Sequence, residues 1–263
     1  MSDYEKLLEI GSDRIFKFLK NIPLHQGQFK YSPFNETCYQ KMFVENSQDN
    51  IKDVEDLRSE IGDLNQTCTT CRHFFFKQRS NSVKKDDIKF GNILEDVLID
   101  FFNEKYKLKA KRGDRENLSY PDCKLLSRDN ETLAYFEVKY HAAPFLSAKK
   151  FTDRDCYEGS ATLDTDKLVK QIKLVESEIN PPVFYLHWID YPCLKGLFYE
   201  TSEQVKEELL TFGVEFERKD RTGDFSEKTN KKVGYTKKSY AKLLEMGSFE
   251  ELVNIFLEMD KNS

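Results

Sequence analysis

The chain has 263 residues, of which 39% are hydrophobic and 33% are charged, a balance typical of globular domains rather than disordered or membrane proteins. No apolar run approaches the length that spans a bilayer, and the stretch from Met1 to Lys6 lacks the features of a signal peptide, so we expect a cytoplasmic protein without membrane contact. The formal net charge of −5 argues against a uniformly basic surface for nucleic acid and is compatible only with a local basic patch.

Residues 1–85 are predicted to form a mainly helical N-terminal region, with a role in recognition, dimerisation or another accessory task, ahead of a core at residues 86–263. Apolar residues between Leu7 and Leu19 follow helical spacing, with an interruption expected near Gly11. The polar run 80–87 is the most linker-like stretch of the chain. It marks the expected boundary between the two regions.

A short cluster in the N-terminal region carries zinc-ligand chemistry. Cys68, Cys71 and His73 offer three ligands within six residues, and Cys38 is the available fourth. A second paired cluster is missing, so two thiols without a ligand role are favoured over a structural zinc site, although both interpretations stay open. In a cytosolic protein we expect free thiols rather than disulfides.

The order of elements becomes clear after the linker-like run. A helix is predicted over Gly91–Lys105, where apolar residues form a broad stripe, and a strand over Tyr106–Lys111, where apolar and basic residues alternate. Two further strands are predicted at 120–126 and 133–140, with the polar turn 127–132 between them. These two strands are expected to form a hairpin.

A second helix and a buried strand follow the hairpin. Apolar residues from Leu168 to Ile179 have helical spacing, and Asp164 or Thr165 is a plausible N-cap. The nearly continuous apolar run Val183–Ile189 is typical of a central strand covered on both faces, and 194–199 is a candidate for another strand. The order α-β-β-β-α-β predicts an α/β fold with a mixed central sheet flanked by helices.

The hairpin carries the residues with the clearest chemistry. Asp122 lies on its first strand and Glu137 and Lys139 on its second, so the hairpin can bring two carboxylates and one ammonium group together. Two carboxylates suit Mg²⁺, which activates water for attack on phosphate, and a lysine beside it can orient the water or stabilise the developing charge. Solvent-facing strand charges are the alternative, since an acid–x–Lys triplet recurs at 217–219 without a Pro-Asp strand nearby.

Pro121-Asp122 and Glu137-Val138-Lys139, in this element order, resemble the PD-(D/E)XK nuclease superfamily, which includes most type II restriction endonucleases. The resemblance covers roughly residues 88–190. It implies a restriction-endonuclease-like core in which Asp122 and Glu137 bind one or two Mg²⁺ ions and Lys139 takes part in hydrolysis. Many members also carry a catalytic Glu on the first helix, here Glu95, which lies on the border of the apolar stripe. A solvated Glu at the helix rim is equally open.

The most basic stretch, 228–242, contains no acidic residue. Its lysines can neutralise phosphates and its tyrosines can stack on nucleic acid, although a solvated face with tyrosines packed beneath is the alternative. The candidate DNA-contacting residues are Lys228, Lys231, Lys232, Tyr235, Lys237 and Lys238. Gln171 is expected at the surface, although some members of the superfamily that the motif resembles place a polar residue there to touch the site or the backbone phosphate. The four histidines are expected to form no paired metal or nucleophile set, with His187 in the core.

Together these features predict a Mg²⁺-dependent endodeoxyribonuclease that cuts double-stranded DNA, as a type II restriction enzyme does. A homodimer is expected, because two strands must be cut and symmetric sites match two-fold symmetry. No Gly-rich phosphate-binding loop occurs, so no nucleotide cofactor is expected. The alternatives are a repair, recombination or phage nuclease of the same superfamily, or a catalytically inactive DNA-binding protein on that fold.

Overall fold

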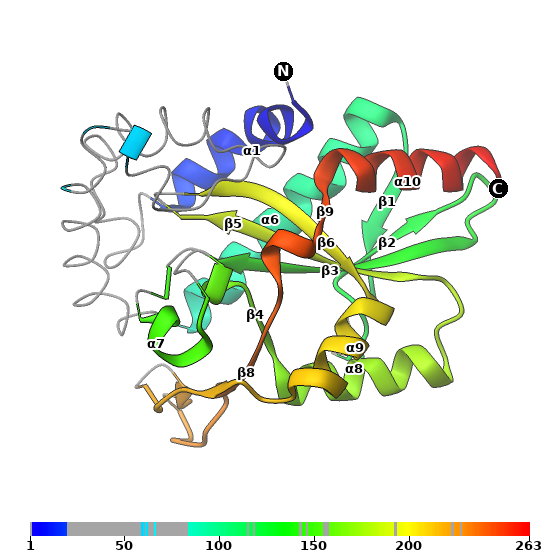
Figure 1. Ribbon diagram of the computed structural model, residues 1–263. Helices are drawn as coiled ribbons and strands as arrows, with labels where there is room; N and C mark the ends of the chain where they lie inside the picture. Colours follow the sequence, from blue (N-terminus) through cyan, green and yellow to red (C-terminus); the bar gives the residue numbers. More distant parts are fainter. Residues whose placement is uncertain are drawn as a thin grey trace.

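A six-stranded mixed sheet organises the protein, and helices cover both of its faces (Figure 1). This α/β architecture agrees with the fold class that the order of elements predicted. The computed structural model describes residues 2–19, 59–60, 62, 66, 84–114, 116–117, 119–141, 144–145, 147–154, 158–191, 194–221, 224–226 and 228–263. Among these residues, no helix combines the length and apolar character needed to cross a membrane.

The strand order in the sheet is β1-β2-β3-β5-β6-β9. β3 and β5 run parallel, because a helical crossover returns the chain to the same end of the sheet, whereas the other neighbouring pairs are antiparallel. β5 is buried along almost its whole length, as the apolar run predicted. The strands are β1 (Lys109–Arg112), β2 (Cys123–Leu126), β3 (Thr132–His141), β5 (Val183–Asp190), β6 (Lys195–Thr201) and β9 (Gly247–Ser248).

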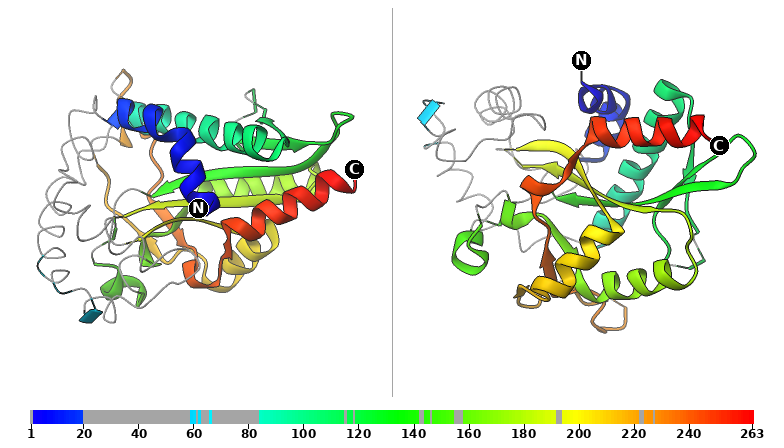
Figure 2. Two further views of the ribbon diagram at one scale, coloured as in Figure 1. Left: turned by 90° about the horizontal axis from the view of Figure 1, so that it is seen from above. Right: turned by 45° about the vertical axis from the view of Figure 1, so that its right-hand side comes forward.

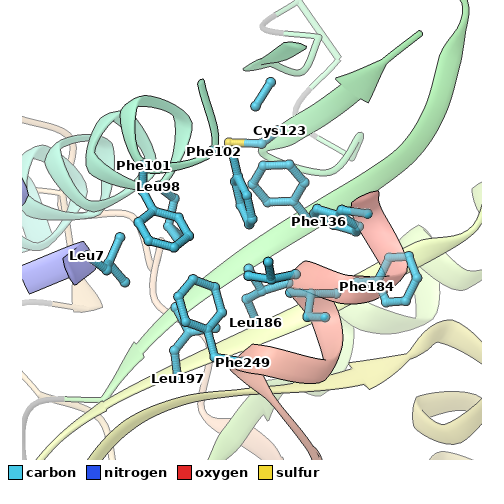
Figure 3. Close-up of a cluster of buried hydrophobic side chains, with 14 of the residues drawn as sticks. Leu7, Leu98, Phe101, Phe102, Cys123, Phe136, Phe184, Leu186, Leu197 and Phe249 are labelled. Carbon is cyan, nitrogen blue, oxygen red and sulfur yellow. The ribbon is translucent and has the colours of Figure 1, made fainter. Parts of the chain in front are cut away.

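One face of the sheet is covered by α1 (Asp3–Leu19), α6 (Lys84–Tyr106) and α10 (Phe249–Lys261) (Figure 2). Their apolar side chains meet those of the strands in the largest hydrophobic core, which is rich in phenylalanine (Figure 3). Phe136 of β3 points into this core, whereas its neighbours in the strand point to the other face. The labelled core residues are Leu7, Leu98, Phe101, Phe102, Cys123, Phe136, Phe184, Leu186, Leu197 and Phe249.

Helix α1 is continuous through Gly11, so the interruption predicted there is wrong. A Cβ atom on Gly11 would lie 2.6 Å from Cγ1 of Val97, so the glycine allows α1 to approach α6 closely. Leu7 is fully buried in the core that α1 and α6 share. The boundary expected between residues 85 and 86 falls in the first turn of α6.

Helix α6 ends at Tyr106, and the next residue adopts a left-handed backbone conformation. This residue, Lys107, has a φ of 59°, and the N–H of Leu108 donates to the carbonyl of Phe102 at 3.2 Å. β1 therefore begins at Lys109 rather than at Tyr106, where the strand was predicted to start.

The other face of the sheet is covered by α8 (Thr165–Ser177) and α9 (Ser202–Phe212). A smaller three-stranded sheet, β4-β8-β7, adjoins α8 and α9, and the sequence patterns did not predict it. Its strands are β4 (Thr162–Asp164), β7 (Phe216–Glu217) and β8 (Lys237–Tyr240). Short helices form at α7 (Ala148–Thr152), η3 (Glu158–Ser160) and η5 (Leu243–Glu245).

Candidate active site

Asp122 lies immediately before β2 and is fixed by the backbone on both sides. Its Oδ2 accepts a hydrogen bond from the N–H of Val138 at 2.9 Å, which ties it to the middle of β3. Its carbonyl accepts from the N–H of Gly113 at 2.8 Å. A Cβ on Gly113 would lie 2.1 Å from the carbonyl oxygen of Pro121, so this close approach requires glycine. The Pro-Asp pair is thereby held against the strand that carries Glu137 and Lys139.

Glu137 is fully buried, and both of its carboxylate oxygens have partners. Oε1 accepts a hydrogen bond from Nζ of Lys139 at 2.6 Å and is also paired with Lys167 of α8. Oε2 accepts from Nε2 of Gln171 at 3.1 Å. Because Glu137 and Lys139 are two positions apart on a strand, both side chains lie on the sheet face that α8 covers. The structure thus brings Asp122, Glu137 and Lys139 together.

The charges at the site are strongly coupled. Burial alone would raise the pKa of Glu137, but the ammonium groups of Lys139 and Lys167 outweigh it and lower that pKa to about 2. Burial and the negative charge of Glu137 raise the pKa of Asp122, against the opposing effect of the lysines. Burial would lower the pKa of Lys139, but Glu137 and Asp122 raise it instead. Lys139 is therefore a permanent cation between two carboxylates at neutral pH.

Helix α8 supplies two residues to the site, Lys167, which the sequence did not reveal, and Gln171, for which a surface position was favoured. Lys167 and Gln171 are four positions apart and therefore lie on the same side of the helix, facing Glu137. Gln171 is only 1% exposed, so the expectation of a surface residue is wrong. The sequence did carry a signal for this burial: Gln171 lies three positions after Leu168, so both residues share the buried face of the helix.

The small sheet brings another ion pair close to the site. Asp164, at the end of β4, is paired with Lys238 of β8. Burial would raise the pKa of Asp164, but the positive charges of Lys238, Lys139 and Lys167 outweigh it and lower that pKa. Lys238 is thereby placed near the catalytic candidates. The other five candidates of the basic stretch, Lys228, Lys231, Lys232, Tyr235 and Lys237, are exposed.

Glu95 of α6 is ion-paired with Arg112 of β1, which also binds Asp96 with an N–O distance of 2.5 Å. α6 covers the face of the sheet that Phe136 enters, whereas Glu137 points to the opposite face. The structure joins Glu95 to Arg112, on the helix that covers the face opposite to Glu137.

A buried polar chain extends from the site across the sheet. His141 Nε2 lies 3.1 Å from His187 Nδ1, and His187 Nε2 lies 2.9 Å from Glu200 Oε2. His187 is in the core, as predicted, and it lies beside His141 within this buried polar chain. Burial lowers the pKa of His187 to about 3, with the charge of Lys139 acting in the same direction. Burial raises the pKa of Glu200 to about 7, against the hydrogen bond with Glu208.

The buried polar chain predicts that the free energy of unfolding falls as pH rises from the ordinary pKa of a glutamate to slightly above 7. Folded Glu200 binds its proton more tightly than the unfolded chain, so its contribution to the free energy of unfolding falls as pH rises through about 7. His187 is neutral in the folded protein, so its contribution to the free energy of unfolding falls only on acidification, below its ordinary pKa. Burial raises the pKa of the neighbouring Glu208 as well, to about 8, so between pH 6.5 and 8.5 we expect a decline on the order of 1 kcal/mol or more from this coupled pair.

Urea unfolding at those two pH values measures this decline. The variant Glu200→Gln should reduce it, because the amide does not ionise. Glu207→Gln removes an exposed carboxylate of α9 and should leave it unchanged. An equal decline in wild type and Glu200→Gln would contradict the assignment.

The donors at the hairpin fit a hard divalent cation. Mg²⁺ is bound in proteins by one or two carboxylates and keeps several waters, so Asp122 and Glu137 are sufficient. Oδ1 of Asp122 accepts no hydrogen bond within the part of the chain that the structure describes. No group of three or more His, Cys, Asp or Glu side chains placed to hold a metal occurs there either. The zinc candidates Cys68, Cys71 and His73 lie outside the described residues.

Neither a scan against protein-family models nor a search of curated proteins found a match to this chain.

Proposed function

We propose that the protein is a Mg²⁺-dependent endodeoxyribonuclease with a PD-(D/E)XK-like core, which cuts double-stranded DNA as a type II restriction enzyme. The observation that carries the proposal is the convergence of Asp122, immediately before β2, with Glu137 and Lys139 of β3. The antiparallel run β1-β2-β3, followed by α8 and by β5 parallel to β3, supports a restriction-endonuclease-like core. The homodimer expected of an enzyme that cuts both strands stays a prediction.

Asp122, Glu137 and Lys139 would have different roles in phosphodiester hydrolysis. When bound, Mg²⁺ supplies an activated water and neutralises phosphate charge. Asp122 and Glu137 provide the carboxylate ligands. Lys139 stays protonated beside them and can donate hydrogen bonds to the attacking water or to a phosphate oxygen. Hydrolysis would leave 5′-phosphate and 3′-hydroxyl ends, as is usual in the superfamily that the motif resembles.

The proposal is tested by incubating the protein with a plasmid of known sequence and Mg²⁺ and then sequencing the ends. Discrete fragments with one sequence at every end support a restriction enzyme. A smear, or cutting governed by DNA structure, supports a repair, recombination or phage nuclease of the same superfamily. No cutting of any DNA with Mg²⁺ or Mn²⁺ overturns the enzymatic proposal.

A catalytically inactive DNA-binding protein on the same fold is the second candidate. The observation that favours it is the pairing of Glu137 with two lysines of its own chain, Lys139 and Lys167. Such pairing neutralises a carboxylate without any metal ion. DNA binding in EDTA, together with no cleavage and no Mn²⁺ binding, would support this candidate over the nuclease.

The double variant Lys237→Ala/Lys238→Ala should weaken DNA binding and make it less dependent on salt. Each phosphate contact removed lowers the slope of log affinity against log salt by about 0.9, so a decrease of up to about 2 is expected. Fluorescence anisotropy between low and moderate salt measures both quantities. The control, Lys89→Ala/Lys261→Ala, removes two exposed lysines of α6 and α10, on the opposite side of the sheet. Unchanged affinity of the first variant excludes β8 from the DNA interface.

A further inference from the structure

Lys167 occupies the position that a bound cation would need. It is paired with Oε1 of Glu137, the same oxygen that accepts the hydrogen bond of Lys139. The second oxygen accepts from Gln171. Glu137 therefore cannot coordinate a metal ion through Oε1 while both ammonium groups remain in place. Coordination through Oε1 requires one of these two ammonium groups to leave first.

Lys167 is the partner best placed to leave. Lys139 belongs to the same strand as Glu137, so the backbone itself keeps it beside the carboxylate. Lys167 reaches Glu137 from a separate element, α8, and its side chain is 25% exposed, slightly more than the 21% of Lys139. A lysine ammonium group on a flexible stem can move to a neighbouring anion at little cost. Two ammonium groups on one oxygen also repel each other, which favours the release of one.

We propose that Lys167 couples DNA binding to metal binding: it holds Glu137 in the metal-free protein and moves to a DNA phosphate when that carboxylate takes a divalent ion. The inference rests on the proposed function. By linkage, a phosphate that attracts Lys167 strengthens metal binding at Glu137, and the metal ion in turn frees Lys167 for DNA. Lys167 thus acts as a competitor of the metal until the substrate arrives.

The decisive measurement is Mn²⁺ binding to the free protein, followed by electron paramagnetic resonance or calorimetry. Lys167→Met should bind Mn²⁺ at least about tenfold more tightly than wild type, because a close competing charge is gone. Lys167→Gln should change the affinity in the same direction and covers the possibility that one variant folds poorly. Lys170→Met, which removes an exposed lysine of the same helix, should bind as wild type does. In Asp122→Ala/Lys167→Met the gain should disappear, which places it at this site.

Two further readouts separate a coupling role from a structural one. In the Lys139→Ala background, which should not cut DNA, Lys167→Met should weaken DNA binding with Mn²⁺ present, since one phosphate contact is lost, and should leave it unchanged in EDTA. In cleavage assays it should reach half of its maximal rate at a lower Mn²⁺ concentration, yet with a lower maximal rate. If wild type and both Lys167 variants bind Mn²⁺ equally, the coupling is overturned even where wild type cuts DNA. If wild type neither binds Mn²⁺ nor cuts, the proposed function itself fails.

Discussion

Replacing Asp122 with alanine is expected to reduce Mg²⁺-dependent cleavage on the order of 10³-fold or more while leaving the free energy of unfolding nearly unchanged. The loss of activity follows from removal of one of the two carboxylates that the donor set offers. The stability is preserved because burial and the charge of Glu137 disfavour the ionised form of Asp122 in the folded protein. Relief of that repulsion offsets the lost hydrogen bond to Val138, which contributes about 1 kcal/mol.

Lys139→Ala should abolish cleavage to a similar degree, because the ammonium group beside the carboxylates is removed. Initial rates on a plasmid and urea unfolding curves measure the two effects in the same preparations, and DNA affinity in EDTA should stay close to wild type. Asp129→Ala and Lys111→Ala remove exposed charges from the β2–β3 turn and from β1, and they should cut at the wild-type rate. Retained turnover in Asp122→Ala or Lys139→Ala would remove the site assignment.

The central part of this site was predictable because local rules govern it. The polar turn between two apolar runs indicates the hairpin, and the two-residue spacing of Glu137 and Lys139 places both on one face. The register then aligns Cys123 with Phe136, so the residue before β2 meets the middle of β3. No long-range information is needed for this step, since a short turn joins the two strands.

The partners from other elements could not be predicted in the same way. The side of α8 that meets Glu137 depends on how the helix is rotated on the sheet, which periodicity does not specify for Lys167. The pair of Asp164 and Lys238 depends on strands that are 74 residues apart, and the basic composition of β8 hides its strand character. Glu95 shows the converse problem. Its helical position allows it to face the sheet edge, but Arg112 of β1 binds it there.

Glu137→Ala is expected to destabilise the protein as well as abolish cleavage, in contrast to Asp122→Ala. The substitution leaves Lys139, Lys167 and the buried amide of Gln171 without their acceptor. Breaking a buried ion pair by removing one partner costs about 3–5 kcal/mol. We expect about 3 kcal/mol, the low end of this range, because both ammonium groups keep some contact with water. Urea unfolding at pH 7 measures the difference.

The double variant Glu137→Ala/Lys167→Met tests whether the loss of stability in Glu137→Ala arises from ammonium groups left buried without a counter-charge. Removing one of the two unpaired ammonium groups should recover part of the stability, so the double variant should be more stable than Glu137→Ala alone. Lys170→Met in the same background removes an exposed lysine and should recover nothing. If Glu137→Ala were as stable as wild type, the buried pairs would not form in solution. The ion pairs of Glu137 with Lys139 and Lys167 would then not be what holds these side chains together at the site.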